Sequence, residues 1–115
     1  MNSKTYTLPI RAVDRDTFLL IKNGKKKVET RAGGKKYKDI RAGDTVVFSC
    51  GKSRFTRTVR TVHVFRTVAA MLRKYKVKDI NPTVTTNKEL IAMYRRFPGY
   101  RLRIKKYGLI VFTLQ

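Results

Sequence analysis

Carboxylates, histidine and cysteine are all scarce in this chain of 115 residues. It holds 7 Asp and Glu against 28 Lys and Arg, with one histidine, His63, and one cysteine, Cys50. A single cysteine cannot form a disulfide within the chain, and a typical zinc site needs three or four His or Cys ligands. The sequence therefore predicts no metal site and no cofactor. It also favours a reducing compartment such as the cytoplasm.

Long apolar stretches are missing as well. The longest apolar runs, 46–48 and 109–112, are far shorter than the roughly 20 residues that cross a bilayer. The chain begins Met1-Asn2-Ser3-Lys4, without the apolar segment of a secretory signal. The helices predicted below do not combine a basic face with a large exposed apolar one. We therefore expect no membrane attachment.

Positive charge is the property that the chain has in excess. The formal net charge is +21, yet 42% of the residues are hydrophobic, 10% are aromatic and only three are proline. A basic tail lacks such apolar content, so we expect one folded domain over residues 1–115. Self-repulsion among so many cations weakens a compact state, and an anionic partner would offset it.

Hydrophobic periodicity predicts a mixed α+β fold. Strands are expected at 6–10, 25–32, 45–50, 55–65 and 108–114, with an extended row at 101–106, and helices at 14–23, 67–75 and 86–97. Strands 45–50 and 55–65 follow each other closely, as in an antiparallel hairpin. The pattern favours a small β-barrel of about five to six strands with two to three flanking helices.

Several polar residues mark the expected helix ends. Asp14 or Asp16 is expected to cap the first helix, and Asn23-Gly24 to stop it in a left-handed conformation. Thr67 is expected to cap the second helix. The run 86–89, Thr-Asn-Lys-Glu, has the spacing of a capping box at the start of the third.

One segment combines a glycine, two cations and a rare acid at fixed spacing. Residues 24–31, Gly-Lys-Lys-Lys-Val-Glu-Thr-Arg, match the pattern Gly-x-Lys-x-x-Glu-x-Arg. Here the sequence resembles the ASCH family of small domains with a PUA-like barrel. The resemblance continues through 40–48, 65–72, Phe97-Pro98 and 107–111. It implies a PUA-like β-barrel and an RNA-binding role.

Glu29 stands out within this segment because its near neighbours are cations. A nearby positive charge should keep Glu29 ionised and hold it in place. In an ideal strand Lys26 and Glu29 would lie on opposite faces, so they converge only if the backbone bends, which Gly24 allows. A structural ion pair between Glu29 and Arg31 on a solvated face is the alternative interpretation.

The resemblance also raises an enzymatic alternative. Some small ASCH members look like amidohydrolases that deacylate N4-acetylcytidine with a motif lysine, a threonine and a distant glutamate. The lysine falls on Lys26, Glu29 occupies the threonine position, and Asp79 is the acid available for the distant glutamate. An enzyme would use Glu29 as base for a water and Lys26 to polarise the amide carbonyl. A small ribonuclease is the other enzymatic alternative.

The remaining candidates are basic and aromatic side chains that suit a nucleic acid. Arg101, Arg103 and Lys105 repeat at period two and would form one row on an extended backbone, with tyrosines beside it. Phosphates attract such a row, and unstacked bases stack on the rings. We expect single-stranded RNA in a basic cleft, with DNA or a ribonucleoprotein as further partners. The binding candidates are Lys25, Lys26, Lys27, Glu29, Arg31, Arg57, Arg60, Tyr100, Arg101, Arg103 and Lys105, with Lys26 and Glu29 catalytic if the cleft is an active site.

Overall fold

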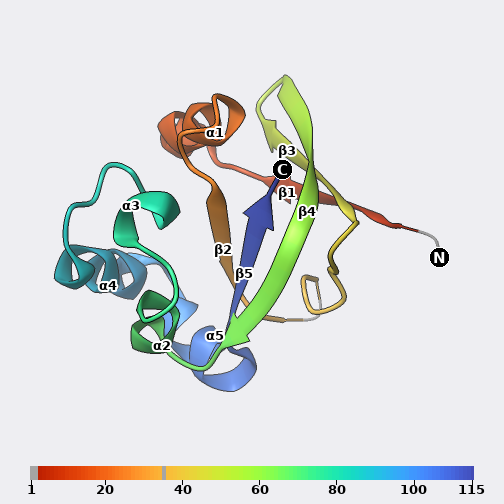
Figure 1. Ribbon diagram of the computed structural model, residues 1–115. Coiled ribbons are helices and arrows are strands. Elements are labelled where there is room, and N and C mark those ends of the chain that lie inside the picture. Colours follow the sequence, from red (N-terminus) through yellow and green to blue (C-terminus); the bar gives the residue numbers. More distant parts are fainter. Residues whose placement is uncertain (1–2, 35) are drawn as a thin grey trace.

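The computed structural model describes residues 3–34 and 36–115, which form five strands and five α-helices (Figure 1). The strands are β1 (Thr5–Pro9), β2 (Val28–Ala32), β3 (Thr45–Cys50), β4 (Ser53–Phe65) and β5 (Leu109–Leu114). The helices are α1 (Arg15–Lys22), α2 (Val68–Leu72), α3 (Val77–Ile80), α4 (Asn87–Arg96) and α5 (Tyr100–Tyr107), with a 3-10 turn, η1 (Ala12–Asp14), before α1. The α+β class and the strand number are confirmed. The expectation of two to three helices is wrong, because it omits α3 and α5.

The five strands form one curled sheet in the order β1-β3-β4-β5-β2. β3 and β4 pair as the expected antiparallel hairpin, β5 pairs antiparallel with β4 and β2, and β1 runs parallel to β3. The edge strands β1 and β2 do not pair with each other in this order. The sheet is therefore a half-barrel with a seam between β1 and β2.

β4 is the strand that lets the sheet curl. Its 13 residues pair first with β3 and then with β5, and the register shifts between Val59 and Thr61. Such an irregularity bends a strand and increases its twist. The two halves of β4 consequently belong to two walls of the half-barrel.

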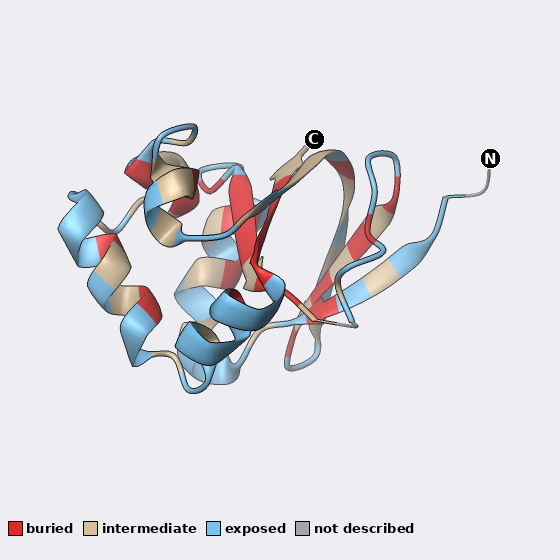
Figure 2. Ribbon diagram, turned by 90° about the horizontal axis from the view of Figure 1, so that it is seen from below, coloured by how far each residue is buried: buried red, intermediate tan, exposed pale blue. Residues whose placement is uncertain are grey.

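Apolar side chains gather in two clusters on either side of β5. Ile110 and Phe112 point into the half-barrel, where they join Phe48. Leu109 and Val111 point to the other face, where helices α2, α3 and α4 cover the sheet (Figure 2). Because alternate residues of a strand face opposite sides, both faces of β5 are buried, which explains its unbroken apolar run.

Most of the expected helix ends are confirmed. The Thr67 hydroxyl accepts a hydrogen bond from the Ala70 N–H at 3.0 Å, and the Thr86 hydroxyl accepts one from the Glu89 N–H at 3.1 Å. Gly24 adopts a φ of 82° after α1. The side-chain cap expected at the start of α1 is wrong: Asp14 occupies the N-cap position but accepts from Arg11 Nε at 3.1 Å instead.

The extended row expected at 101–106 is wrong, because these residues lie in α5. Ile104 is buried there, whereas Leu102 is 74% exposed, although strand alternation would turn both inward. β5 already pairs with β4 and β2 on its two edges, so a strand at 101–106 would have no place beside it. Lys, Arg and Leu are also good helix formers, and Ile104 and Tyr100 pack the helix against the second apolar cluster.

α5 is held against the end of β2 by a close backbone contact. The Gly33 N–H donates to the Gly108 carbonyl at 2.8 Å. A Cβ at Gly33 would lie 2.8 Å from the Tyr107 carbonyl oxygen, so only glycine fits without a shift. This contact places α5 beside β2, and side chains of α5 reach the seam. No helix in the described part of the chain has the length and apolar character to cross a membrane.

Candidate functional site

A cleft of about 380 Å³ opens beside β2, at the seam between the two edge strands of the half-barrel. The end of β1, η1 and α1 form one side, and the end of α3 together with α4 and α5 forms the other. Its charged lining consists of Arg11, Asp14, Lys26, Glu29, Arg31 and Arg103, and its aromatic lining of Tyr37, Tyr94, Phe97 and Tyr100.

Lys26 and Glu29 converge in this cleft. Lys26 Nζ lies 3.5 Å from Glu29 Oε1, and each residue is only 6% exposed. Lys26 precedes β2, and its N–H donates to the Leu20 carbonyl of α1 at 2.9 Å. The backbone therefore bends between Gly24 and β2, as convergence required, and strand alternation does not apply to Lys26.

The ammonium group of Lys26 is fully used by the protein. Its Nζ donates to the carbonyl oxygens of Val28 and Ile80 and faces the Glu29 carboxylate. An ammonium has three N–H donors, so none is left for a ligand. Burial lowers the pKa of Lys26, and the Glu29 charge offsets this in part. Lys26 thus ties the start of β2 to the end of α3.

Glu29 is held as a charged acceptor by three donors. Oε1 accepts from the Thr30 N–H at 2.9 Å, and Oε2 accepts from Arg31 Nη2 at 3.2 Å. Burial by itself would raise the pKa of Glu29, but Lys26, Arg31 and the Thr30 N–H outweigh burial and lower it. One lone pair of Oε2 stays free to accept from a ligand.

The Arg31 guanidinium lines the cleft and has hydrogen-bond donors that its protein partners do not use. Its Nη2 donates to Glu29, and its Nη1 donates across the seam to the Pro9 carbonyl at 3.4 Å. Burial opposes the charge, but Glu29 raises the pKa of Arg31. A guanidinium has five N–H donors, so three have no partner among residues 3–34 and 36–115. The group also lies 5.8 Å from the centre of the Tyr37 ring, which a cation favours.

Aromatic rings form the wall of the cleft that α4 and α5 contribute. The rings of Phe97 and Tyr100 are 4.9 Å apart, and those of Tyr94 and Tyr100 are 6.2 Å apart and nearly parallel. The Tyr94 hydroxyl is hydrogen-bonded to the Thr30 hydroxyl. Burial raises the pKa of Tyr94 and of Tyr100, so both hydroxyls are neutral. The guanidinium of Arg103 lies 5.3 Å from the Tyr100 ring.

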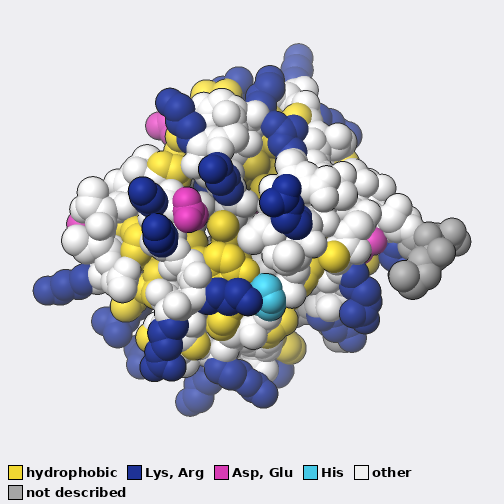
Figure 3. Space-filling view, viewed as in Figure 1, with side chains coloured by type: hydrophobic (Ala, Val, Ile, Leu, Met, Phe, Trp, Pro, Cys, Tyr) yellow, Lys and Arg dark blue, Asp and Glu magenta, His cyan; other side chains and the backbone are white. Residues whose placement is uncertain are grey.

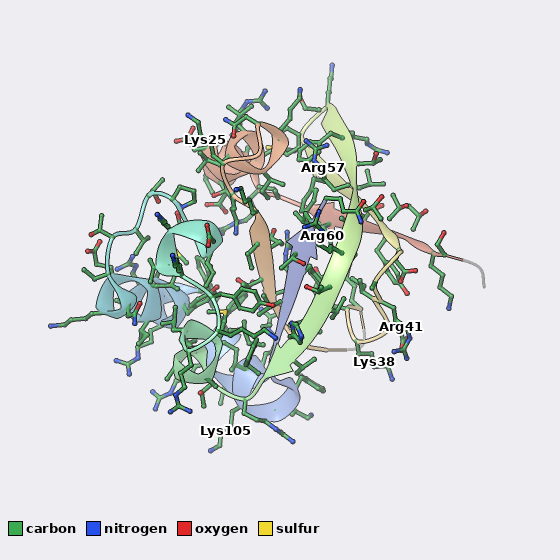
Figure 4. All side chains as sticks on the ribbon, in the orientation of Figure 1. Lys25, Lys38, Arg41, Arg57, Arg60 and Lys105 are labelled. Carbon is green, nitrogen blue, oxygen red and sulfur yellow. The ribbon has the colours of Figure 1, made fainter. Side chains whose placement is uncertain are left out.

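The structure brings together five of the residues predicted from the sequence. Lys26, Glu29, Arg31, Tyr100 and Arg103 line the cleft. The other predicted residues do not line it: Lys25, Lys27, Arg57, Arg60, Arg101 and Lys105. Figure 4 shows Arg57 and Arg60 together on β4, Lys25 beside α1, and Lys105 on α5 at the opposite end of the molecule. Asp79, the acid considered for a hydrolase, is not in the lining either.

Two of these side chains depart from their expected arrangement for identifiable reasons. Arg57 donates to the Lys22 carbonyl at 2.7 Å and lies 4.7 Å from the Phe55 ring, so its guanidinium joins β4 to α1. Arg103 points away from Arg101 and Lys105, because residues two apart on a helix lie on opposite faces. The expected single row of three cations is therefore wrong.

Sequence reasoning missed Tyr37 and Tyr94 as cleft residues. Tyr94 belongs to the apolar stripe of α4, and its periodicity indicates only burial. Its hydroxyl was the available signal, because a buried tyrosine needs a polar partner, here Thr30. Tyr37 lies in a lysine-rich loop after β2, where no periodicity applies.

The cleft carries more positive than negative charge. Four cations and two carboxylates line it, and three ion pairs neutralise part of this charge: Arg11 with Asp14, and Glu29 with both Lys26 and Arg31. A surplus of positive charge remains, because Glu29 is shared by two cations and Arg103 pairs with no carboxylate among the described residues. Lys and Arg side chains also surround the face of the molecule shown in Figure 3. Within residues 3–34 and 36–115, no group of three His, Cys, Asp or Glu gathers where it could hold a metal ion.

Known structures share the fold of this chain over nearly its whole length. No protein-family model matches the chain, and no curated protein matches it closely. The chain is similar to the crystal structure of hypothetical protein PH0355, with a TM-score of 0.82, 29% identity and 97% of each chain covered. It is also similar to the solution NMR structure of protein PF0455 from Pyrococcus furiosus, with a TM-score of 0.75, 29% identity and 96% of each chain covered.

Proposed function

We propose that this chain is an RNA-binding domain of the ASCH type, with a PUA-like half-barrel, that receives single-stranded RNA in the cleft beside β2. The motif residues Lys26, Glu29 and Arg31 meet in that cleft, which is what a functional motif requires. The observation that carries the proposal is Arg31, a guanidinium with three free donors beside an aromatic wall.

The chemistry of the cleft suits a nucleotide better than a neutral metabolite. Arg103 Nη2 donates to the Pro98 carbonyl at 3.2 Å, and Arg31 donates to Glu29 and Pro9. The other guanidinium donors of both residues match the oxygens of a phosphate or a base carbonyl. Tyr37 and Tyr100 offer rings on which a base can stack, and such stacking contributes about 1–3 kcal/mol. The free lone pair of Glu29 Oε2 can accept from an amino or imino group of the base.

The charge outside the cleft supports a polymer rather than a free nucleotide. The net charge is +21, and Lys25, Arg60, Arg101 and Lys105 are exposed outside the cleft. Such a surface would neutralise neighbouring phosphates of a strand and release the counterions condensed on them, which strengthens binding without reading sequence.

A hydrolase in the same cleft has weaker support. An N4-acetylcytidine amidohydrolase needs Lys26 to polarise the amide carbonyl, but its three donors are directed at Val28, Ile80 and Glu29. Lys26 would have to give up one of these buried partners for the substrate. A ribonuclease role requires the same exchange if Lys26 is its catalytic cation.

The direct test is the binding of a fluorescently labelled single-stranded RNA, measured by anisotropy at several salt concentrations. We expect log affinity to fall linearly with log salt, with a slope of about −0.7 for each phosphate contacted. Absence of binding at low salt, or an affinity that does not change with salt, would contradict the proposal.

A matched pair of variants in α5 tests the location. Arg103→Gln removes a cation of the cleft, whereas Arg101→Gln removes an exposed cation of the same helix that does not line it. We expect roughly tenfold weaker binding for Arg103→Gln, as for one lost charged hydrogen bond, and within about twofold for Arg101→Gln. Equal losses would show that binding depends on total charge and not on the cleft.

An assay with N4-acetylcytidine separates binding from hydrolysis. We expect no release of cytidine above the buffer control, because Lys26 has no free donor. Turnover that Arg101→Gln retains and Glu29→Gln loses, while circular dichroism shows Glu29→Gln to be folded at the assay temperature, would instead establish the hydrolase.

A further inference from the structure

A second cluster of polar side chains lies outside the cleft, between β4 and the segment after α2. His63 Nδ1 is 2.7 Å from the Tyr75 hydroxyl, and His63 Nε2 is 3.1 Å from Lys74 Nζ. None of these three residues lines the cleft. The proposed function therefore leaves the chain's single histidine without a role.

The contacts of this cluster fix the direction of its hydrogen bonds. An ammonium only donates, so Lys74 donates to His63 Nε2, which must carry a lone pair. The hydrogen of the neutral imidazole then lies on Nδ1 and is donated to the Tyr75 oxygen. Two N–H groups of Lys74 and the O–H of Tyr75 remain as donors. The cluster thus offers three donors to its surroundings.

Packing and backbone contacts hold these donors in position. The Tyr75 ring meets the Phe65 ring edge-on, with centroids 6.1 Å apart at 90°. The N–H groups of Lys74 and Tyr75 both donate to the Met71 carbonyl at 3.0 Å. A ligand would therefore meet a Tyr75 hydroxyl that is already ordered, which reduces the entropy lost on binding.

No salt bridge of the described residues neutralises the charge of Lys74. In the part of the chain that the structure describes, the three salt bridges involve other cations: Arg11, Lys26 and Arg31. Figure 3 shows the histidine at the surface, directly beside a Lys or Arg side chain and with more such side chains around it. An anion with several acceptor oxygens can approach this face.

We propose that Lys74, His63 and Tyr75 form a subsite for a backbone phosphate of RNA whose other nucleotides occupy the cleft. The inference rests on the proposed function, because the RNA is the ligand in both. A phosphodiester oxygen accepts from Lys74 Nζ and a second oxygen accepts from the Tyr75 hydroxyl, while His63 orients both donors. His63 and Tyr75 are positioning and binding groups here, and no bond is made or broken.

The single histidine gives a direct measurement. The ring nitrogens of His63 produce one isolated set of signals in a two-bond 1H–15N correlation spectrum, and their shifts report the tautomer. We expect the free protein to show hydrogen on Nδ1. Addition of the labelled single-stranded RNA should shift the His63 signals saturably, at the same concentrations at which anisotropy reports binding.

Two variants of equal charge loss make the assignment specific. Lys74→Gln removes the proposed contact, and Lys76→Gln removes an exposed lysine two residues away; the two ring nitrogens of His63 contact Tyr75 and Lys74 instead. We expect RNA binding to weaken about two- to fivefold in Lys74→Gln, as for an exposed ion pair, and the His63 shift on RNA addition to disappear. Lys76→Gln should retain the shift.

The outcomes separate this inference from the proposed function. RNA that binds by anisotropy while the His63 signals stay fixed would overturn the subsite and leave the RNA-binding function standing. The same holds if Lys74→Gln and Lys76→Gln behave alike. Inorganic phosphate that shifts His63 when RNA does not would show a site for a free anion and would also overturn the inference. Absence of RNA binding in the anisotropy assay would instead overturn the proposed function, and the inference with it.

Discussion

Two basic segments of the chain, residues 24–31 and Tyr100–Tyr107, differ in whether the fold buries their cations. In the first, Lys26 and Arg31 turn inward around Glu29 and become part of the cleft. In the second, Arg101 and Lys105 remain exposed on α5. Both segments mix cations with apolar residues, so composition does not distinguish them.

The difference between the two segments comes from one carboxylate, that of Glu29. A cation is buried at a tolerable free energy only when an opposite charge and hydrogen-bond acceptors replace water. Glu29 provides that charge for Lys26 and Arg31, and the Val28 and Ile80 carbonyls provide further acceptors for Lys26. The segment Tyr100–Tyr107 contains no acid, so its cations stay in water. In a chain with 7 acids, the position of an acid thus indicates where cations are buried.

Removal of that carboxylate should have the largest effect. Glu29→Gln leaves the Lys26 charge buried without its partner, which should lower the free energy of unfolding by about 3–5 kcal/mol. The matched control is Asp16→Asn, an exposed acid of α1 outside these ion pairs, for which we expect a change within about 0.5 kcal/mol. Urea unfolding followed by circular dichroism measures both. Similar losses in the two variants would contradict the role given to Glu29.

The second segment is tested by its two apolar residues. Ile104→Ala should cost about 2 kcal/mol of unfolding free energy because Ile104 is buried, whereas Leu102→Ala should cost less than about 0.5 kcal/mol because Leu102 is 74% exposed. The same unfolding measurement applies. A strand would bury both side chains, so equal costs would argue against α5.

Acid should lower the stability of the fold by protonating Glu29 in the first segment. Its pKa in the folded chain lies below the ordinary 4.5 because of Lys26 and Arg31, so the unfolded chain takes up the proton first as the pH falls. The stabilisation from Glu29 is therefore complete above pH 4.5 and is lost as the pH falls through the folded-state pKa. Unfolding experiments between pH 6 and about pH 3 should show a smaller dependence on pH for Glu29→Gln than for the natural chain. Parallel curves would contradict this expectation.

The smallest effect is expected from the exposed cations of α5. The double variant Arg101→Gln/Lys105→Gln should weaken RNA binding by about two- to threefold at low salt, because exposed charges act through a screened field. At high salt its affinity should approach that of the natural chain. A larger loss than that of Arg103→Gln would place the main RNA contact on the outer face of α5.

The sequence predicted the elements whose signals are local. The hairpin of β3 and β4, the caps at Thr67 and Thr86 and the stop at Gly24 follow from alternation, hydroxyl caps and glycine, and each is present. α5 was not predictable in this way, because residues 101–106 fit a strand and a helix equally well. The lack of a free edge beside β5 decided between them.

The candidate site also contains residues that the sequence indicates and residues that only the tertiary structure reveals. The sequence singles out Lys26, Glu29 and Arg31 through the pattern Gly-x-Lys-x-x-Glu-x-Arg, and the rare acid Glu29 among cations is a local signal. Tertiary structure decided that Lys26 has no free donor, since Ile80 lies 54 residues away and comes close only when α3 packs on β2. It also decided that Tyr37, Tyr94 and Arg103 reach the cleft, because the curled sheet and the glycine contact under α5 bring distant segments to one seam. Residues that are neighbours in the sequence therefore indicate which charges pair. Which hydrogen-bond donors and acceptors stay unused depends on the distant backbone groups that the fold brings near them.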